Sequence, residues 1–100
     1  MAYLVTLTFD LKDAESQDYE CIQTALAKIS LQSKLKGKNG RFTDLSKNTF
    51  SGVVDGKTSL DLRETYTSNI SKIFKDCKVK GRFYVSVGDN YSWENIFRLV

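Results

Sequence analysis

The segment 3–9 constrains the fold of this chain more than any other. It reads Tyr-Leu-Val-Thr-Leu-Thr-Phe, so nearly every residue is apolar or β-branched. Successive side chains of a strand point to opposite faces. One face is then entirely apolar and consists of Tyr3, Val5, Leu7 and Phe9. The other is half-polar and consists of Leu4, Thr6, Thr8 and Asp10. The pattern predicts a central strand with one buried face, ending at Asp10.

Two segments carry apolar residues at helical spacing. An acidic run over 13–18 complements a helix dipole, and with Ser16 as N-cap it predicts a helix over about 16–30. The apolar residues of this helix are Tyr19, Ile22, Ala25, Leu26 and Ile29. The second helix opens at 58–61, Thr-Ser-Leu-Asp, a capping box with Asp in place of Glu. Its apolar stripe consists of Leu62, Tyr66, Ile70, Ile73 and Cys77.

Three more segments are typical of strands. The alternating segment 31–36 predicts an edge strand, because its lysines discourage unwanted pairing. Residues 37–48 predict a polar loop, with a small hairpin around Asn39-Gly40 as an alternative. Residues 48–55 and 82–87 predict the third and last strands.

The order strand, helix, strand, strand, helix, strand predicts an α+β fold of the ferredoxin-like βαββαβ plan. In this plan both helices cover one face of an antiparallel sheet. Right-handed crossovers place the first and third strands in the middle. One hundred residues are enough for a single domain, 1–100. The apolar segment 91–100 is expected to add an edge strand or to extend a dimer interface.

Composition excludes several classes of protein. Hydrophobic residues make up 41% and charged residues 27%, which argues against disorder. No apolar run approaches the roughly 20 residues that span a bilayer, and residues 1–10 lack the pattern of a signal peptide. We therefore expect a cytoplasmic protein without a membrane segment. There is also no glycine-rich phosphate loop, so no small-molecule cofactor is expected.

The chain has no histidine and only two cysteines, Cys21 and Cys77. Catalysis by Ser-His-Asp or Cys-His groups is therefore excluded, and almost no zinc ligands remain. Each cysteine lies in an apolar helical pattern. Because reduced, buried thiols are the rule in the cytosol, we expect no disulfide.

Basic residues cluster in two segments, 21–48 and 72–82. Two such clusters could bind the phosphates of RNA or DNA, or could simply form a solvated surface. The net charge of +3 is small for a nucleic-acid-binding domain, which favours the solvated surface. The candidate phosphate-binding residues are Lys34, Lys36, Lys38 and Arg41.

The half-polar face of the central strand would stay uncovered if the helices pack on the apolar face. Such a face either binds a partner or packs against a second copy, and we favour a homodimer. The predicted members of this face are Leu4, Thr6, Thr8, Asp10, Arg82 and Tyr84. The run 80–87 superficially resembles an RNA-binding motif whose aromatic residues stack on bases. Phe83 and Tyr84 are adjacent, however, so they point to opposite faces and Phe83 is expected in the core.

Several segments carry a resemblance to a known family. One is 5–11, Val-Thr-Leu-Thr-Phe-Asp-Leu, with its aspartate at the predicted strand end. The others are Asp18-Tyr19-Glu20 with Leu26, the strand after Asn48-Thr49-Phe50, and Val85-Ser86-Val87-Gly88 with an aromatic-rich end at Trp93. Together they resemble the Cas-two superfamily, which includes the small CRISPR-associated subunit, VapD-type toxins and SinR-like proteins. The SinR-like members fit best.

This resemblance implies a ferredoxin-like homodimer. In nuclease-active members, the aspartate that ends the first strand faces its dimer mate and helps to hold a divalent metal, and Asp10 matches it. Two carboxylates across a two-fold axis can hold Mg²⁺ or Mn²⁺ and activate water for phosphodiester hydrolysis. The acidic residues Asp13, Glu15 and Asp18 could supply a further ligand or simply complement the helix dipole. Asp10 could equally cap the turn after the strand.

Three functions remain open at this point. The favoured one is a non-catalytic homodimeric interaction module. The alternatives are a metal-dependent endoribonuclease of the VapD toxin type, with Asp10 as catalytic residue and metal ligand, and a weak nucleic-acid-binding protein.

Overall fold

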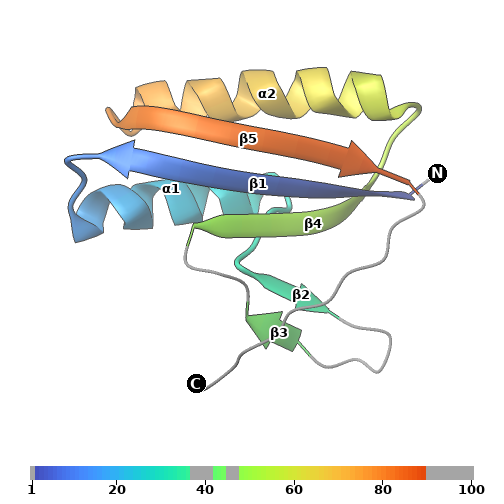
Figure 1. The fold of residues 1–100 in the computed structure, drawn as a ribbon, viewed down its shortest axis with the longest axis horizontal. Coiled ribbons are helices and arrows are strands. Elements are labelled where there is room, and N and C mark those ends of the chain that lie inside the picture. The colour runs from blue at the N-terminus through green and yellow to red at the C-terminus, as the bar shows by residue number, and fades with distance from the viewer. Residues whose placement is uncertain (1, 37–41, 45–47, 90–100) are drawn as a thin grey trace, which may run out of the picture.

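A computed structural model describes residues 2–36, 42–44 and 48–89. It has a small α+β fold in which three antiparallel strands and two helices form the body, with a separate two-stranded ladder beside it (Figure 1). The elements are β1 (Ala2–Lys12), α1 (Ser16–Lys28), β2 (Lys34–Lys36), β3 (Phe42–Asp44), β4 (Thr49–Asp55), α2 (Ser59–Asp76) and β5 (Lys80–Gly88).

The central strand is β1, as its composition predicts. It pairs antiparallel with β4 on one side and with β5 on the other. The strand does not end at Asp10, so that prediction was wrong. Asp10 pairs with Arg82 and Lys12 pairs with Lys80, which extends β1 by two residues. The pairing partner lies far away in the sequence, and the local pattern of residues 3–10 contains no sign of it.

Both helices pack on the predicted apolar face of β1. In Figure 1 they lie behind the sheet, with α2 along β5 and α1 behind β1. The described core combines odd-numbered residues of β1 with one residue of β4, one from the segment after α1, and residues of both helices. Its members are Val5, Leu7, Phe9, Ile22, Leu26, Leu31, Phe50, Tyr66, Ile70 and Phe74.

Phe9 lies at the centre of an aromatic cluster in this core. Its ring centroid is 5.8 Å from that of Phe50, 6.1 Å from that of Phe74 and 6.5 Å from that of Tyr19. Phe74 in turn lies 5.4 Å from Phe83. Such pairs contribute about 0.5–1.5 kcal/mol each beyond the burial of their area. The cluster thus joins β1, β4, β5 and both helices, and the core position predicted for Phe83 is confirmed.

Each helix begins with a cap. Thr58 caps α2, because its hydroxyl oxygen accepts a hydrogen bond from the Asp61 amide at 3.0 Å. In α1 the N-cap is Glu15 and not Ser16, so that prediction was one residue late. Glu15 and Asp18 form a reciprocal capping box, in which the Glu15 amide donates to the Asp18 carboxylate at 2.9 Å. A capping box satisfies two backbone donors that the helix would otherwise leave free.

The segment after α1 crosses to the outer edge of β4. The amide of Gln32 donates to the Ser51 carbonyl at 3.0 Å, and the Ser51 amide donates back at 2.8 Å. This crossing depends on Gly52, because a Cβ there would collide with the Ser30 carbonyl oxygen. The predicted strand over 31–36 is therefore a single bridge followed by the short β2.

The predicted loop over 37–48 contains an additional strand, β3, so the loop prediction was wrong at 42–44. β3 pairs antiparallel with β2, which agrees with the hairpin alternative. The turn residues Asn39-Gly40 and the segment 91–100 lie outside the described residues.

A disulfide joins Cys21 to Cys77, with a Cα–Cα distance of 5.9 Å, so the prediction of two separate thiols was wrong. Cys21 lies on the exposed side of α1 and Cys77 is the C-cap of α2. The helical pattern of each segment does not show that the packed helices bring these two positions together. Among the described residues, no helix is long and apolar enough to cross a membrane. The cytoplasmic location stays a prediction, and the disulfide argues against it because such bonds persist mainly in oxidising compartments.

Candidate interaction surface

The face of the sheet opposite the helices is the candidate functional site, and we call it the open face. It is formed by alternate residues of β1 together with their cross-strand neighbours. Its exposed or half-buried members are Leu4, Thr6, Thr8, Asp10, Lys12, Thr49, Val53, Asp55, Lys80, Arg82, Tyr84 and Ser86. All six residues predicted for this face are among them.

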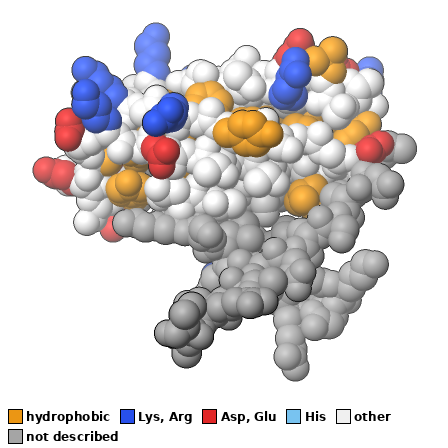
Figure 2. Space-filling view, viewed as in Figure 1, with side chains coloured by type: hydrophobic (Ala, Val, Ile, Leu, Met, Phe, Trp, Pro, Cys, Tyr) orange, Lys and Arg blue, Asp and Glu red, His pale blue; other side chains and the backbone are white. Residues whose placement is uncertain are grey.

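Large hydrophobic side chains lie in the middle of the open face. The Tyr84 side chain is 68% exposed and that of Val53 is 49% exposed. Val53 pairs with the half-buried Leu4, and Tyr84 pairs with Thr8. Figure 2 shows hydrophobic side chains in the middle of this face, surrounded by uncharged atoms. A tyrosine exposed to this degree on a rigid strand is typical of a contact surface, since its ring offers a large area at low conformational cost.

The open part of this face lies mainly over β1 and β5, with Val53 and Asp55 also exposed on β4. On β4, Ser51 shares the face but is buried, and its backbone is paired with Gln32. Within the described part of the chain, no hydrogen bond reaches its hydroxyl oxygen. The surface available to a partner is therefore centred on Tyr84 and Thr8.

Charged residues gather where β1 ends and β5 begins, on the left of Figure 2. Asp10 pairs with Arg82 and Lys12 pairs with Lys80 across the two strands. A shallow hollow lies here, lined by Asp10, Leu11, Lys12, Gly81 and Arg82. The strands approach closely because residue 81 is glycine: a Cβ there would collide with the Asp10 carbonyl oxygen.

Asp10 is exposed on the open face, with basic side chains around it. Within the described ranges, no three residues among His, Cys, Asp and Glu come together as a group that could hold a metal ion. A metal ion at Asp10 would therefore need further ligands from outside this part of the chain. The Cas-two resemblance implies that a second subunit, related by a two-fold axis, supplies one.

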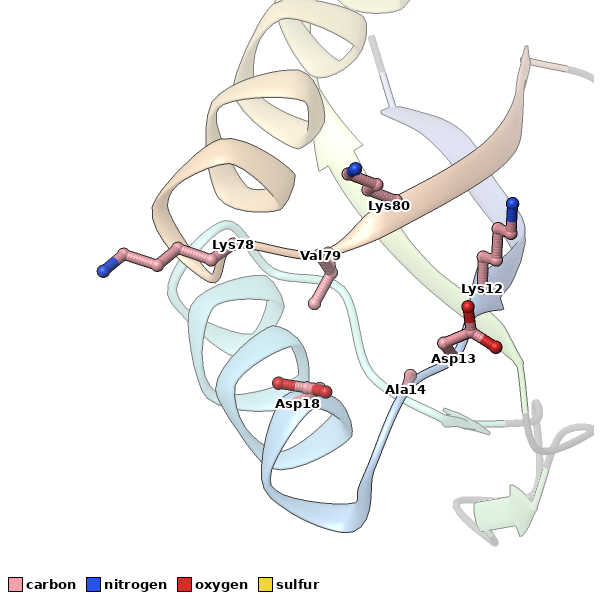
Figure 3. Close-up of a pocket in the computed structure, with 7 residues that line it drawn as sticks. All are labelled: Lys12, Asp13, Ala14, Asp18, Lys78, Val79 and Lys80. Carbon is pink, nitrogen blue, oxygen red and sulfur yellow. The ribbon is translucent and has the colours of Figure 1, made fainter.

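The acidic residues at the start of α1 have other neighbours. Asp18 belongs to the capping box, and Asp13 adopts a left-handed conformation (φ 53°) in the connection that follows β1. Both line a cavity of about 230 Å³ between this connection and the one from α2 to β5. Figure 3 shows the cavity residues, with Lys78 extending away from the others. The cavity is smaller than the roughly 300–1,000 Å³ of typical small-molecule sites, so we assign it no ligand.

The predicted phosphate-binding residues are described only in part. Lys34 is exposed at the start of β2. Lys36 ends the same strand, and its side chain lies outside the described part. Lys38 and Arg41 also lie outside the described residues. Binding of RNA or DNA by these four residues stays a prediction.

The structure identifies one feature of the open face that the sequence reasoning missed. Val53 joins Leu4 because β4 pairs with β1 in a register that the third strand's own sequence does not specify. The burial pattern of β4 is irregular, because the adjacent residues Phe50 and Ser51 are both buried. Alternation within β4 therefore does not assign Val53 to a face. Only the pairing partner places Val53 beside Leu4.

The chain matches no known protein-family model, and no curated protein matches its sequence. The resemblance to the Cas-two superfamily therefore stays a prediction that rests on the short segments quoted above.

Proposed function

We propose that this protein is a non-catalytic interaction module that forms a homodimer through the open face of its sheet. The observation that carries the proposal is the exposure of Tyr84, 68%, in the middle of a face that the helices leave uncovered. Val53 and Leu4 extend the apolar surface on the neighbouring strands. Two sheets pack face to face at about 10 Å, which allows such side chains to interdigitate.

The proposal includes a ferredoxin-like sheet in which β2 follows β4, giving the order β5-β1-β4-β2. It is supported by the paired hydrogen bonds between Gln32 and Ser51, which join the segment leading into β2 to the outer edge of β4. With β3 taken as an additional strand, the chain order also fits this plan: β1, α1 and β2 precede β4, and α2 and β5 follow it.

The test is the dissociation constant of the dimer, measured from the concentration dependence of the mass in solution. We expect Tyr84→Asp to weaken the dimer at least tenfold, because it places a charge in the apolar contact. Leu60→Asp is the matched control: Leu60 is 51% exposed, but it lies in the first turn of α2, away from the open face. An equal effect of both changes, or no effect of Tyr84→Asp, would refute the role of the open face.

A metal-dependent endoribonuclease of the VapD toxin type is the second candidate function. It is favoured by the exposure of Asp10 on the same face that would form the dimer, because a suitable two-fold axis would bring two carboxylates together. This function predicts RNA cleavage that requires Mg²⁺ or Mn²⁺ and is abolished by Asp10→Asn. Cleavage by the wild-type protein that persists in Asp10→Asn would exclude Asp10 as the metal ligand.

A further inference from the structure

We propose that the outer edge of β5 binds an extended segment of a partner protein, which adds a strand antiparallel to β5 and places acidic side chains beside Lys80 and Arg82. In this mode of recognition, backbone hydrogen bonds provide affinity and alternate side chains provide specificity. The inference goes beyond the proposed homodimer, because it uses the edge of the sheet and not its open face.

β5 is the end strand of the three-stranded sheet. It pairs with β1 on one side, and within the described ranges no strand pairs with its other side. Such an edge presents a row of backbone N–H and C=O groups that can pair with another chain. Since β5 is nine residues long, this row is long enough to hold an extended segment along its whole length.

β5 lacks most of the features by which soluble proteins prevent pairing at an edge, which are proline, bulges, charged side chains and short strands. The chain contains no proline. The register between β1 and β5 runs without a break along all of β5, so this pairing has no bulge. Charged side chains occur only at Lys80 and Arg82, and the remaining segment 83–88 reads Phe-Tyr-Val-Ser-Val-Gly. Most of β5 is therefore suited to pairing.

The opposite edge of the sheet is protected. There the segment after α1 bridges to β4, through the two backbone hydrogen bonds between Gln32 and Ser51. The contrast between the two edges identifies β5 as the edge at which a further strand can be added.

The start of β5 carries a repulsion that the fold itself does not offset. Lys80 lies directly opposite Lys12, and both side chains are exposed (Figure 3). Like charges directly opposite each other destabilise a sheet. At the neighbouring level Arg82 has Asp10 opposite it, whereas Lys80 has a lysine in that place. A carboxylate opposite Lys80 on an added strand would offset this repulsion, so the partner segment is acidic at this level.

The helix side of β5 specifies apolar residues at the alternate positions. Phe83, Val85 and Val87 are half-buried and pack against the core. Apolar side chains of an added strand would continue this row on the same side of the sheet. The partner segment therefore alternates apolar with polar residues. Because it runs antiparallel to β5, its acidic residues lie near its C-terminal end.

The position of α2 favours a single extended segment over a second copy of the chain. In Figure 1, α2 runs along β5 on the side away from β1. A second copy that paired through its own β5 would bring its own α2 behind the same seam. Two helices would then compete for one place, whereas an extended segment brings no helix.

The experiment is a titration of the full chain, labelled with ¹⁵N, followed by the NMR shifts of its backbone amides. The probe is a peptide of the same nine-residue length as β5, Thr-Val-Thr-Val-Thr-Val-Glu-Val-Glu, and the control peptide has lysine in place of both glutamates. We expect the glutamate peptide to shift the amides of 80–88 in a saturable way and to leave those of α1 unchanged. No shifts in 80–88 would overturn the binding edge. Equal affinity for both peptides would overturn the acidic chemistry of the partner.

Reversing the charge of Lys80 should exchange the preference. We expect Lys80→Glu to weaken the glutamate peptide about tenfold at low ionic strength, where exposed charges are least screened, and to make the lysine peptide the tighter ligand. The variant should fold, because it replaces two like charges across β1 and β5 by opposite ones. Lys28→Glu is the matched control, since Lys28 is exposed at the end of α1, away from β5. An unchanged preference in Lys80→Glu, or an equal loss in Lys28→Glu, would overturn the role of Lys80.

Light scattering on the same samples separates this proposal from the homodimer. We expect the glutamate peptide to leave the number of chains per particle unchanged. A fall from two chains to one would show that a second copy occupies the edge of β5, which would overturn the proposed partner. Binding at 80–88 by a chain that stays monomeric throughout would support the edge and refute the open-face homodimer.

Discussion

The two faces of β1 are built from the same eleven residues and behave in opposite ways. Val5 and Leu7 on the helix side are fully buried, whereas Thr8 and Asp10 on the open face are exposed. The helix side is closed by the aromatic cluster and both helices, and the open face ends in side chains that nothing in the described chain covers. The difference shows that only the helix-side face of β1 contributes to the hydrophobic core. Within the described residues the other face adds nothing to this core, and it is the face through which we propose that the chain associates.

The largest expected effect comes from shortening a side chain on the buried face of β1. Leu7→Ala should lower the free energy of unfolding by about 2–5 kcal/mol, because it leaves a cavity among fully buried neighbours. The adjacent Thr8→Ala should cost less than about 1 kcal/mol, since Thr8 is exposed. Urea unfolding of both variants measures the contrast. Equal losses would show that the two faces are not distinct.

The disulfide lies on the helix side, so its loss should lower stability without changing association. Reduction of Cys21–Cys77 should lower the free energy of unfolding by about 2–4 kcal/mol, because the bond closes a long loop. Urea unfolding with and without a dithiol reductant measures this. The Cys21→Ser/Cys77→Ser variant is the control and should not respond to reductant. An unchanged midpoint for the wild-type protein would contradict the bond.

Tyr66 adds a pH dependence that belongs to the helix side alone. Its hydroxyl donates a hydrogen bond to the Ile29 carbonyl at 2.8 Å, and burial raises the pKa of this phenol above its usual value. The folded protein therefore holds the proton more tightly than the unfolded chain, and the stability it provides is lost as the pH rises beyond about 10. Tyr66→Phe should cost about 0.5–1.5 kcal/mol at neutral pH.

The alkaline part of this prediction is checked by comparing the two proteins. Unfolding of Tyr66→Phe should show a weaker loss of stability above pH 10 than unfolding of the wild-type chain. Parallel pH profiles for both would show that Tyr66 does not titrate with folding.

The smallest effect is expected where the chain leaves the helix side to reach the outer edge of β4. Ser30 follows the C-cap of α1 with a φ of 69°, a conformation that glycine adopts without strain. Ser30→Gly should raise the free energy of unfolding by about 0.5–1 kcal/mol. Thermal unfolding measures the shift, and a lower melting temperature would contradict this reading of the backbone.

Much of the buried face could be predicted from local sequence, because alternation in 3–9 and the helical spacing of Tyr66 and Ile70 report burial directly. The start of α2 could also be predicted, since a cap such as Thr58 acts within four residues. The full length of β1, the strand β3 and the position of Val53 depend on pairing partners that no local pattern reveals. The disulfide escaped prediction for the same reason, because it depends on how α1 packs beside α2.

The candidate site was predictable in composition but not in arrangement. Asp10, Arg82 and Tyr84 follow from strand periodicity alone, and the structure brings them to one face. The place of Val53 beside Leu4 on the same face became visible only with the register of β4. What Asp10 faces in a dimer depends on a second chain, which no property of the single sequence specifies.

The mass of the wild-type chain in solution, measured by light scattering over a range of concentrations, tests the central claim most directly. The chain has a mass of 11.4 kDa. If the open face is covered by a second copy, the mass should approach twice that value as the concentration rises. A mass that stays at the value of one chain throughout would contradict self-association through this face.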